Sequence, residues 1–451
     1  MGSSVHENVI FWALWLATLV ICVQQLFQAS LKRDTILGFV PPFCMMFGYF
    51  YVVQAAIVAV NLADRVSPTY LVLGQLVALT SLVGCLWGWH RGAAGSTRTD
   101  PHDNVVQNTQ TLWYLSICAI LVALVGQYTF FSSTIFRASG YQEASAYWYL
   151  LFHVAYPGLA ICVSLISRRP EFRGGGPTLL ILIFSALLMF PWVVAARRGP
   201  LFPFFVVVIY SYYLMRPKLV NRAVVIGGLG AAGVLMLLFF MIRDYSATGV
   251  LKYNEDRLQR STALDIITGK AYEESDNEFL YHCVTVGSVI EMERFQWCTG
   301  YLSLAMHWIP RSWWPDKPPL AQGWLDPLSK DDMFNLTGVY MTPGASVGGV
   351  AESFIETGWF TPIFWYAIGW VVGRIYLYGR RHPTRVGPII YVGILAGSHW
   401  LISQGFAAAF VPIAIYVTVP IVIFAVATSR RPAPTTQYAI RGRRAPALIS
   451  R

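Results

Sequence analysis

Apolar runs of about 20 residues recur along nearly the whole chain, and shorter polar segments separate them. A run of this length crosses the hydrocarbon core of a bilayer as an α-helix. The pattern predicts an all-α, polytopic integral membrane protein with about eleven transmembrane helices. The short run at 200–215 and the tight junction at 404–406 leave ten or twelve open. The predicted spans are 9–28, 36–60, 69–89, 111–131, 146–167, 177–196, 200–215, 223–242, 358–378, 387–404 and 406–427.

The composition agrees with this pattern. Of the 451 residues, 55% are hydrophobic and only 12% are charged, whereas a soluble globular protein carries about 25% charged residues. These proportions exclude a soluble enzyme, a disordered chain and a secreted disulfide scaffold. The net charge of +10 does not indicate a nucleic-acid partner, because the Lys and Arg residues lie in short loops between the apolar runs. Residues 1–8 contain no Lys or Arg, so no cleavable signal peptide is expected.

The basic residues also predict the direction in which the chain crosses the membrane. The tail after Ser429 carries six arginines and no acidic residue, so it is expected to be cytoplasmic. Counting back from the tail, every loop assigned to the inner side contains at least two Lys or Arg residues. The prediction is an odd number of spans, with the N-terminus outside and the C-terminus in the cytoplasm.

One connection is much longer than the others. The chain divides into eight spans over residues 1–242, a large outer loop over 243–357, three spans over 358–428, and a basic tail over 429–451. Loops of this length are usually functional. The apolar stretch Thr299–Pro310 is expected to form a helix that rests on the membrane face.

Several basic residues fall on the predicted outer side, against the usual bias. Arg197 and Arg198 occupy a tight turn between two spans, Arg243 opens the long loop, and Arg311 and Lys317 belong to a proline-rich segment. The pair in the turn has an alternative explanation, since arginines at helix ends often extend to the headgroups. A cluster of guanidinium groups binds phosphate oxygens in a bidentate manner. We expect these residues to bind a lipid diphosphate and to stabilise it as a leaving group.

The same proline-rich segment, 309–319, contains Trp313 and Trp314. Its four prolines restrict the backbone to a rigid path. The two indoles are candidates for stacking on a sugar, although tryptophan is also enriched at membrane interfaces for other reasons.

A general base is needed if the acceptor is a hydroxyl group. Glu352 and Glu356 are four residues apart and share a face of the helix predicted before span 358–378. Burial would raise their pKa towards a range useful for proton abstraction. The alternative is a solvated acidic pair near a helix N-terminus. Glu352 is preferred as the base, because it follows a glycine-rich stretch that would permit close approach of a substrate.

Other polar residues carry weaker signals. His153 and His399 lie in predicted spans, where a lone histidine is more often part of the core than a catalyst. No third acid accompanies the pair at 331–332, so no metal site is expected. Cys283 and Cys298 are candidates for a disulfide on the oxidising side. No inner loop contains an Asp-x-Asp motif or a P-loop, so the donor is expected to be an activated lipid.

Together these motifs resemble the bacterial oligosaccharide repeat-unit polymerases (Wzy-type O-antigen and exopolysaccharide polymerases). The matching pieces are the Arg-Arg-Gly turn at 197–199, Arg243 before the large loop, the segment 309–318, and the stretch 348–358 that leads into the next span. The resemblance covers about 150 residues, mainly from 190 to 380.

The resemblance implies a glycosyltransferase of the bacterial inner membrane with an active site that faces the periplasm. Such enzymes transfer a glycan from undecaprenyl diphosphate to a hydroxyl of a second lipid-linked repeat unit, with inversion and without a metal or cofactor. Carried over to this chain, Arg197 or Arg198, Arg243 and Arg311 would hold the diphosphate, and Glu352 would act as base or position the acceptor. A chain-length regulator and a flippase are candidate partners.

Two other functions remain open. An O-antigen ligase uses the same donor and pairs outer arginines with a loop histidine, for which His282 or His307 would serve. A lipid-linked oligosaccharide flippase or other transporter would perform no chemistry. Transporters usually carry ionisable groups near the bilayer midplane and show inverted repeats, and neither feature is visible in the sequence.

Overall fold

The computed structural model describes most of the apolar runs and parts of the long loop. The described residues are 2–31, 35–62, 65–95, 108–132, 143–194, 199–216, 221, 223–225, 227–228, 230, 277–307, 314, 330–339, 346–383 and 385–429. Within these ranges all regular secondary structure is helical. Seven of the described helices are long and apolar enough to cross a membrane, and two shorter apolar helices accompany them. The protein is therefore an all-helical, multi-pass membrane protein.

The helices before the long loop follow the predicted runs closely. The span predicted at 36–60 is α2 and α3 joined by a π-helical turn, and the span predicted at 146–167 is α6 and α7, which are interrupted at His153 and Val154. The run 223–242 lies mostly outside the described residues, so the count of eleven spans stays a prediction. The bounds are α1 Gly2–Leu31, α2 Val40–Gly48, α3 Gln54–Asn61, α4 Pro68–Ala93, α5 Thr109–Ser132, α6 Glu143–Phe152, α7 Ala155–Arg168, α8 Gly175–Val194 and α9 Leu201–Leu214.

In the described residues from 277 onwards, four short helices and three longer ones follow. The predicted helix at Thr299–Pro310 is present as α14. The bounds are α13 Glu278–Glu291, α14 Thr299–His307, α16 Lys330–Thr337, α17 Gly348–Thr357, the 3-10 turn η6 Gly358–Phe360, α18 Thr361–Arg381, α19 Gly387–Ser403 and α20 Phe406–Ser429.

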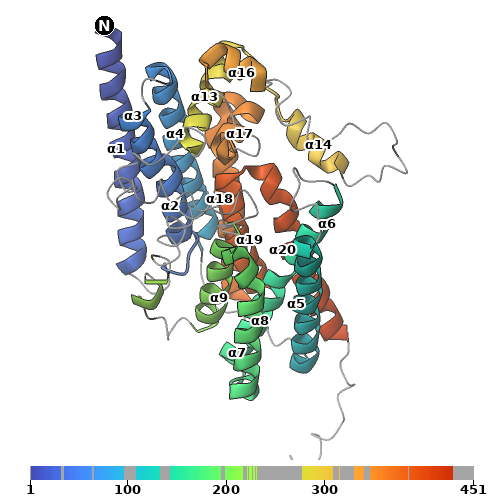
Figure 1. Cartoon of the computed structure of the whole chain (residues 1–451). Coiled ribbons are helices and arrows are strands. Elements are labelled where there is room, and N and C mark those ends of the chain that lie inside the picture. Colours follow the sequence, from blue (N-terminus) through green and yellow to red (C-terminus); the bar gives the residue numbers. More distant parts are fainter. Residues whose placement is uncertain are drawn as a thin grey trace, which may run out of the picture.

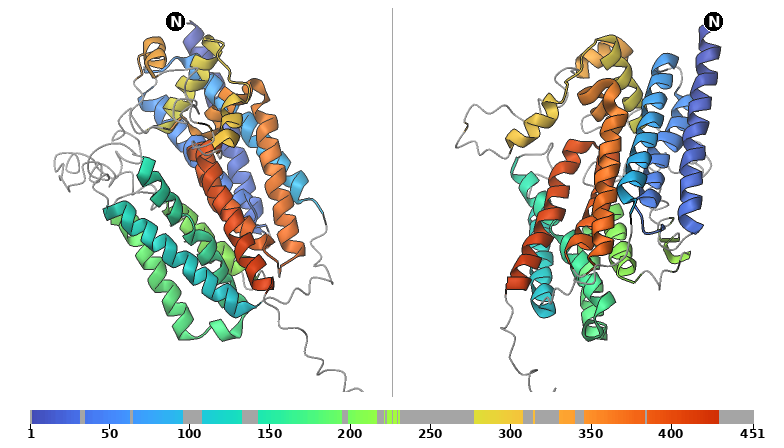
Figure 2. Two further views of the ribbon diagram at one scale, coloured as in Figure 1. Left: turned by 90° about the vertical axis from the view of Figure 1, so that its right-hand side faces the viewer. Right: turned by 180° about the vertical axis from the view of Figure 1, so that it is seen from behind.

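The bundle has two distinct ends (Figure 1). The four short helices α13, α14, α16 and α17 gather at the end where α1 begins, which we call the distal end. The opposite, proximal end is where α20 ends. In the right-hand view of Figure 2 the helices α18 and α20 run between a group formed by α1 to α4 and a group formed by α5 to α8, and α9 packs against α19 and α7. The last turns of α4, α7 and α18 carry basic residues at the proximal end, among them Arg91, Arg168 and Arg380.

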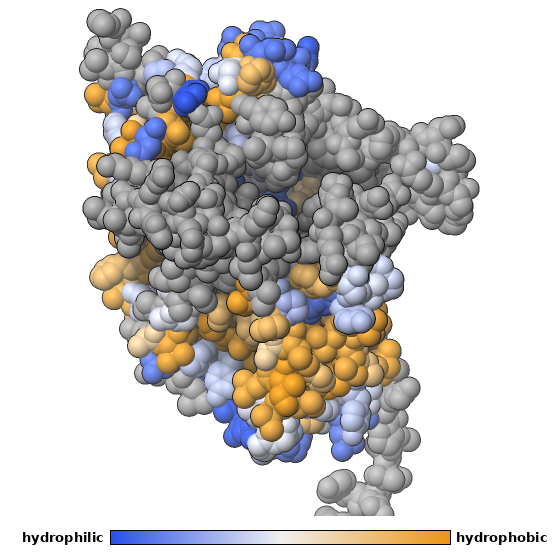
Figure 3. Space-filling model, viewed as in Figure 1, coloured by the Kyte–Doolittle hydropathy of each residue, from blue (hydrophilic) through white to orange (hydrophobic). Residues whose placement is uncertain are grey.

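The lateral surface is apolar. On the face shown in Figure 3, hydrophobic side chains cover the surface over α5 and α8, and hydrophilic side chains gather at the proximal end and around α16. Exposed residues of α8 include Leu182, Leu187 and Phe190. Such a surface suits contact with lipid, because the hydrocarbon core offers no partners to polar groups.

The closest helix pair is α4 against α18, which share the most extensive contact among the described helices. Gly84, Gly88 and Gly92 lie four residues apart on the face of α4 that meets α18. A Cβ atom added to Gly88 would lie 2.0 Å from the carbonyl oxygen of Tyr366. Small residues at this spacing let two helix backbones approach closely, which is a main source of helix association in membranes.

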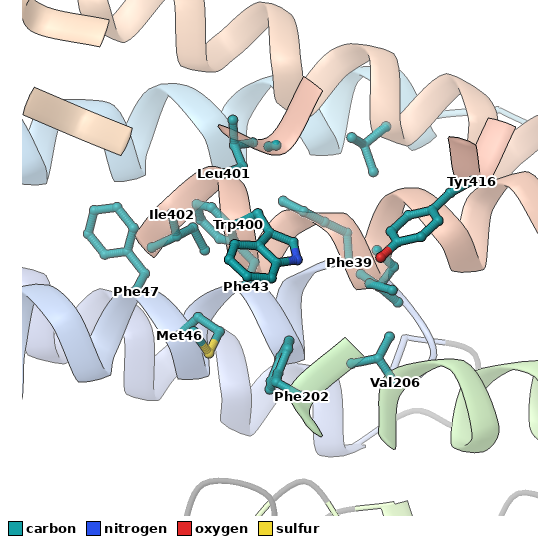
Figure 4. Close-up of a cluster of buried hydrophobic side chains, with 14 of the residues drawn as sticks. Phe39, Phe43, Met46, Phe47, Phe202, Val206, Trp400, Leu401, Ile402 and Tyr416 are labelled. Carbon is teal, nitrogen blue, oxygen red and sulfur yellow. The ribbon is translucent and has the colours of Figure 1, made fainter. Parts of the chain in front are cut away.

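A second core region joins the two halves of the chain. In Figure 4, Phe43 and Phe47 of α2 lie beside Trp400 and Ile402 of α19, and Phe202 of α9 lies next to them. This packing fixes the distal end of α19, where the polar groups described below are held.

Candidate active site

Helix α17, which carries both candidate acids, is buried along its whole length. All ten residues from Gly348 to Thr357 are buried. A Cβ atom added to Gly349 would lie 1.8 Å from the carbonyl oxygen of Leu401, so α17 packs directly against the backbone of α19. On the other side, the indole of Trp365 in α18 donates a hydrogen bond of 2.9 Å to Ser353. The explanation of Glu352 and Glu356 as a solvated acidic pair is therefore wrong.

The carboxylate of Glu352 is clamped by the connection between α19 and α20. Its side chain is 7% exposed, and its Oε1 accepts a hydrogen bond of 3.1 Å from the backbone N–H of Ala407. Gly405 has a φ of +111°, and a Cβ atom there would lie 1.4 Å from Oε2. Burial raises the pKa of Glu352 to about 8, because removal from water disfavours the charged form. The first turn of α20 partly offsets this by donating to the carboxylate.

Glu356 is held in a similar way by the start of α14. Its Oε2 accepts a hydrogen bond of 3.1 Å from the N–H of Gly300, and a Cβ atom on Gly300 would lie 1.9 Å from Oε1. The backbone carbonyl of Glu356 accepts a second bond of 2.7 Å from the N–H of Cys298. Burial raises the pKa of this carboxyl as well.

Tyr301 is the third ionisable group at this place. Its ring stacks on Phe364 and meets the edge of Phe406, at centroid distances of 5.3 and 5.1 Å. Burial raises the pKa of the phenol, and the neighbouring Glu352 and Glu356 raise it further. Its hydroxyl is buried and has no hydrogen-bond partner within the described residues. The site thus combines two buried carboxyl groups, whose pKa values are raised by burial, with a phenol that is available as a donor.

The glycines near Glu352 do not have the role that was expected from the sequence. The glycine-rich stretch before Glu352 was expected to admit a substrate, but Gly349 serves to pack α17 on α19. The glycine that approaches the carboxylate is Gly405, which the sequence analysis did not single out. Its position between two apolar runs was the available signal, because glycine is common where a helix ends with a positive φ.

All of the predicted phosphate-binding residues lie outside the described residues: Arg197, Arg198, Arg243, Arg311 and Lys317. Trp313, a candidate for stacking on a sugar, also lies outside them. Trp314 is described and half-buried.

The end of the Arg-Arg-Gly turn is nevertheless located by Gly199 and Pro200. A Cβ atom on Gly199 would lie 2.8 Å from Cη2 of Trp400, and the carbonyl of Pro200 accepts a bond of 2.7 Å from the hydroxyl of Tyr156. The backbone carbonyl of Trp400 in turn accepts a bond of 3.0 Å from the N–H of Gly405. One residue of α19 therefore contacts both the end of this turn and the glycine that clamps Glu352.

The histidines lie in the core. His153 is fully buried, and its Nδ1 lies 2.6 Å from the hydroxyl of Tyr416. His399 packs on Phe202 with ring centroids 5.4 Å apart. His282, a candidate base under the ligase hypothesis, has its Nε2 2.9 Å from the carbonyl oxygen of Gly74. The side chain of His307 is outside the described residues.

The remaining candidates do not form sites in the described part of the chain. Asp332 forms an ion pair of 3.3 Å with Arg294 at the surface. Among the described residues, no group of three or more His, Cys, Asp or Glu side chains is arranged to hold a metal ion. Cys283 and Cys298 are both free, the first buried in α13 and the second exposed.

Comparison of the chain with protein-family models, with curated proteins and with solved structures gave no match. The assignment of function therefore rests on the chemistry of the chain's own residues.

Proposed function

We propose that this protein is a glycosyltransferase of the bacterial inner membrane that polymerises undecaprenyl-diphosphate-linked oligosaccharide repeat units. The reaction takes place at the distal end, on the periplasmic face, with inversion and without a metal ion. The N-terminus then lies outside and the arginine-rich C-terminal tail lies in the cytoplasm.

The observation that supports the proposal most is the position of Glu352. The acid is buried at the distal end beside Gly405, and the adjoining Trp400 contacts Gly199, the residue after Arg197 and Arg198. The proposed proton acceptor and the residue that follows the arginine pair are therefore linked through the same residue of α19, although more than 150 residues separate Glu352 from Gly199 in the sequence.

In the proposed reaction the acceptor hydroxyl attacks the anomeric carbon of the donor. Its oxygen forms the new glycosidic bond, its proton passes to the carboxylate of Glu352, and the bond between the anomeric carbon and the diphosphate oxygen breaks. Arg197 or Arg198, with Arg243, Arg311 and Lys317, stabilises the departing lipid diphosphate. Glu356, Trp313 and Trp314 are proposed to position the acceptor sugar.

The test is polymer formation from a synthetic lipid-linked repeat unit by the purified protein in nanodiscs. Glu352→Gln is expected to lower the rate about 100-fold or more, the usual effect of removing a general base. Glu171→Gln, which changes an exposed acid at the proximal end, is the matched control and should retain full activity. Normal polymer length from the Glu352→Gln variant would remove this acid from the mechanism.

A second outcome of the same assay distinguishes the ligase alternative. A protein that transfers glycan only when a lipid A core acceptor is supplied would be a ligase. The polymerase is favoured because His282, one of the two candidate loop histidines, is buried and has its Nε2 2.9 Å from the carbonyl oxygen of Gly74 in α4.

A further inference from the structure

The distal end exposes a group of large apolar side chains that the proposed reaction does not use. They come from the turn before α14, from α14 itself, from η6 and from the start of α18. Each is between 58% and 63% exposed, and we call the set the distal aromatic patch: Trp297, Leu302, Trp359, Phe360 and Ile363.

The patch continues a surface that already faces lipid. From Ile363 the exposed apolar residues of α18 go on through Trp370, Val371 and Tyr378, at the spacing of one helix face. Since α18 lies along the spanning helix α4, this face points outward from the bundle. The patch is the distal extension of this face.

The backbone at Trp297 is strained. Trp297 and Cys298 have φ values of +50° and +68°. Residues other than glycine seldom adopt such values, which cost on the order of 1–3 kcal/mol each. The turn is fixed by hydrogen bonds of 2.8 Å from the N–H of Gln296 to Ile355 and 2.7 Å from the N–H of Cys298 to Glu356. An exposed indole is thus presented by a strained turn that is tied to α17.

Contacts of the Trp297 indole and of neighbouring aromatic rings connect the parts of the distal aromatic patch. A Cβ atom on Gly358 would lie 3.6 Å from Cη2 of Trp297, so the indole lies against the start of η6. Phe295 contacts both Trp297 and Phe354, and Phe354 meets Trp359 edge to face at 5.3 Å. These ring contacts join the turn and η6 into one surface.

We propose that the distal aromatic patch inserts into the headgroup and upper acyl region of the membrane leaflet at the distal end. The partner is a phospholipid bilayer. Tryptophan and other aromatic residues concentrate at this depth, because their rings combine an apolar body with a polar edge. Surface segments of this kind sit about 5–10 Å into the boundary between headgroups and acyl chains. Exposed Glu293 and Arg294 precede Trp297 and remain on the water side.

Insertion of the patch also sets the level of the candidate active site. The turn that carries Trp297 donates to Glu356, and Tyr301 in the next helical turn lies against Phe364 of α18. Glu352 and Glu356 would therefore lie at headgroup level, where a lipid-linked donor presents its diphosphate. This consequence rests on the proposed function, whereas insertion of the patch does not.

The experiment measures the depth of a nitroxide label on Cys298 in nanodiscs of phosphatidylethanolamine and phosphatidylglycerol. Cys118 is the only other exposed cysteine of the seven, so Cys118→Ser leaves Cys298 as the reactive position. Accessibility to oxygen, which enters lipid, is compared with accessibility to a water-soluble nickel chelate.

Two matched positions calibrate the measurement. A label on Cys118 of α5, in a Cys298→Ser background, gives the value for the membrane interior. A label on a Leu336→Cys variant, with both exposed cysteines replaced, gives the value for water, because Leu336 is exposed on α16 at the far distal end (Figure 1).

The expected depth for the Cys298 label lies between the two references, with access to the nickel chelate several-fold lower than at position 336. A second probe, Leu302→Cys in the same background, tests the patch without a label in the strained turn and should give the same result. Full water accessibility at both positions would overturn the proposal. Spin–spin broadening that disappears on dilution with unlabelled protein would also overturn it, in favour of a second copy of the chain on the patch.

Discussion

Two regions of this molecule contain glycines at points of close contact between chain segments, and the glycines of the two regions have different roles. Between α4 and α18, Cβ atoms on Gly84, Gly88 and Gly92 would all collide with backbone carbonyl oxygens. At the acidic site, Cβ atoms on Gly300 and Gly405 would collide with the carboxylates of Glu356 and Glu352.

The two regions differ in which atoms can move to relieve a clash with an added Cβ atom. A backbone carbonyl in a helix is fixed by the helix, so a clash there must separate the two helices. A carboxylate at the end of a side chain can rotate away, so a clash there moves the acid and leaves the bundle assembled. The first region therefore determines whether the protein folds, and the second determines where its acids point.

The largest expected effect is that of Gly88→Ala. Its Cβ would lie 2.0 Å from the oxygen of Tyr366, and separation of α4 and α18 is expected to cost about 3 kcal/mol or more of folding free energy. The measurement is the midpoint of thermal unfolding in detergent, together with the yield of monodisperse protein.

The same substitution at Gly48 in α2 is the control. Nothing lies within 4 Å of a Cβ there, so Gly48→Ala should be neutral or stabilise the helix by about 0.5–1 kcal/mol. Equal stability of the two variants would show that the α4–α18 contact is not the determinant of folding.

The next effect in size is that of Gly405→Ala on activity. The new methyl group displaces the carboxylate of Glu352, so polymer formation should fall about as far as in Glu352→Gln, while the protein still folds with a loss of about 1–2 kcal/mol from the positive φ. Activity is measured with the lipid-linked repeat unit in nanodiscs.

Gly338→Ala separates the effect of backbone strain from the effect of displacing the Glu352 carboxylate. Gly338 has a φ of +71° with nothing within 4 Å of its Cβ, so this variant has the backbone strain but displaces no carboxylate. It should lose a comparable amount of stability and keep its activity. Loss of activity in both variants would assign the effect to strain alone.

The last expected effect is a pH dependence carried by Glu352. Its folded-state pKa of about 8 lies above the value of about 4.3 in an unfolded chain. The stability this group contributes is therefore fully present below about pH 4 and is lost as the pH rises towards 8, by at most about 1.4 kcal/mol per pH unit. The rate of polymer formation should rise over the upper part of the same range as the carboxylate becomes a base.

Glu352→Gln provides the comparison for this prediction. Stability measured by thermal unfolding between pH 5 and pH 8 should vary less in the variant than in the native chain. An unchanged dependence would mean that Glu352 is already ionised at neutral pH.

Much of the architecture was predictable from the sequence. The apolar runs predicted the helices to within a few residues, for example α5 and α20, because a helix in lipid must satisfy its own backbone hydrogen bonds and needs a fixed length of apolar side chains. The pairing of Glu352 and Glu356 on one helix face was also predictable, since residues four apart are neighbours on any α-helix.

The chain by itself thus determined its helices and the acids that share a face, since both follow from periodicity within one segment. Only the tertiary structure decided that α17 is buried, that Gly405 from a distant turn closes on Glu352, and that Trp400 contacts both that turn and Gly199. These contacts join residues far apart in the chain through the exact fit of one backbone against another, and no local pattern of polar and apolar positions encodes that fit.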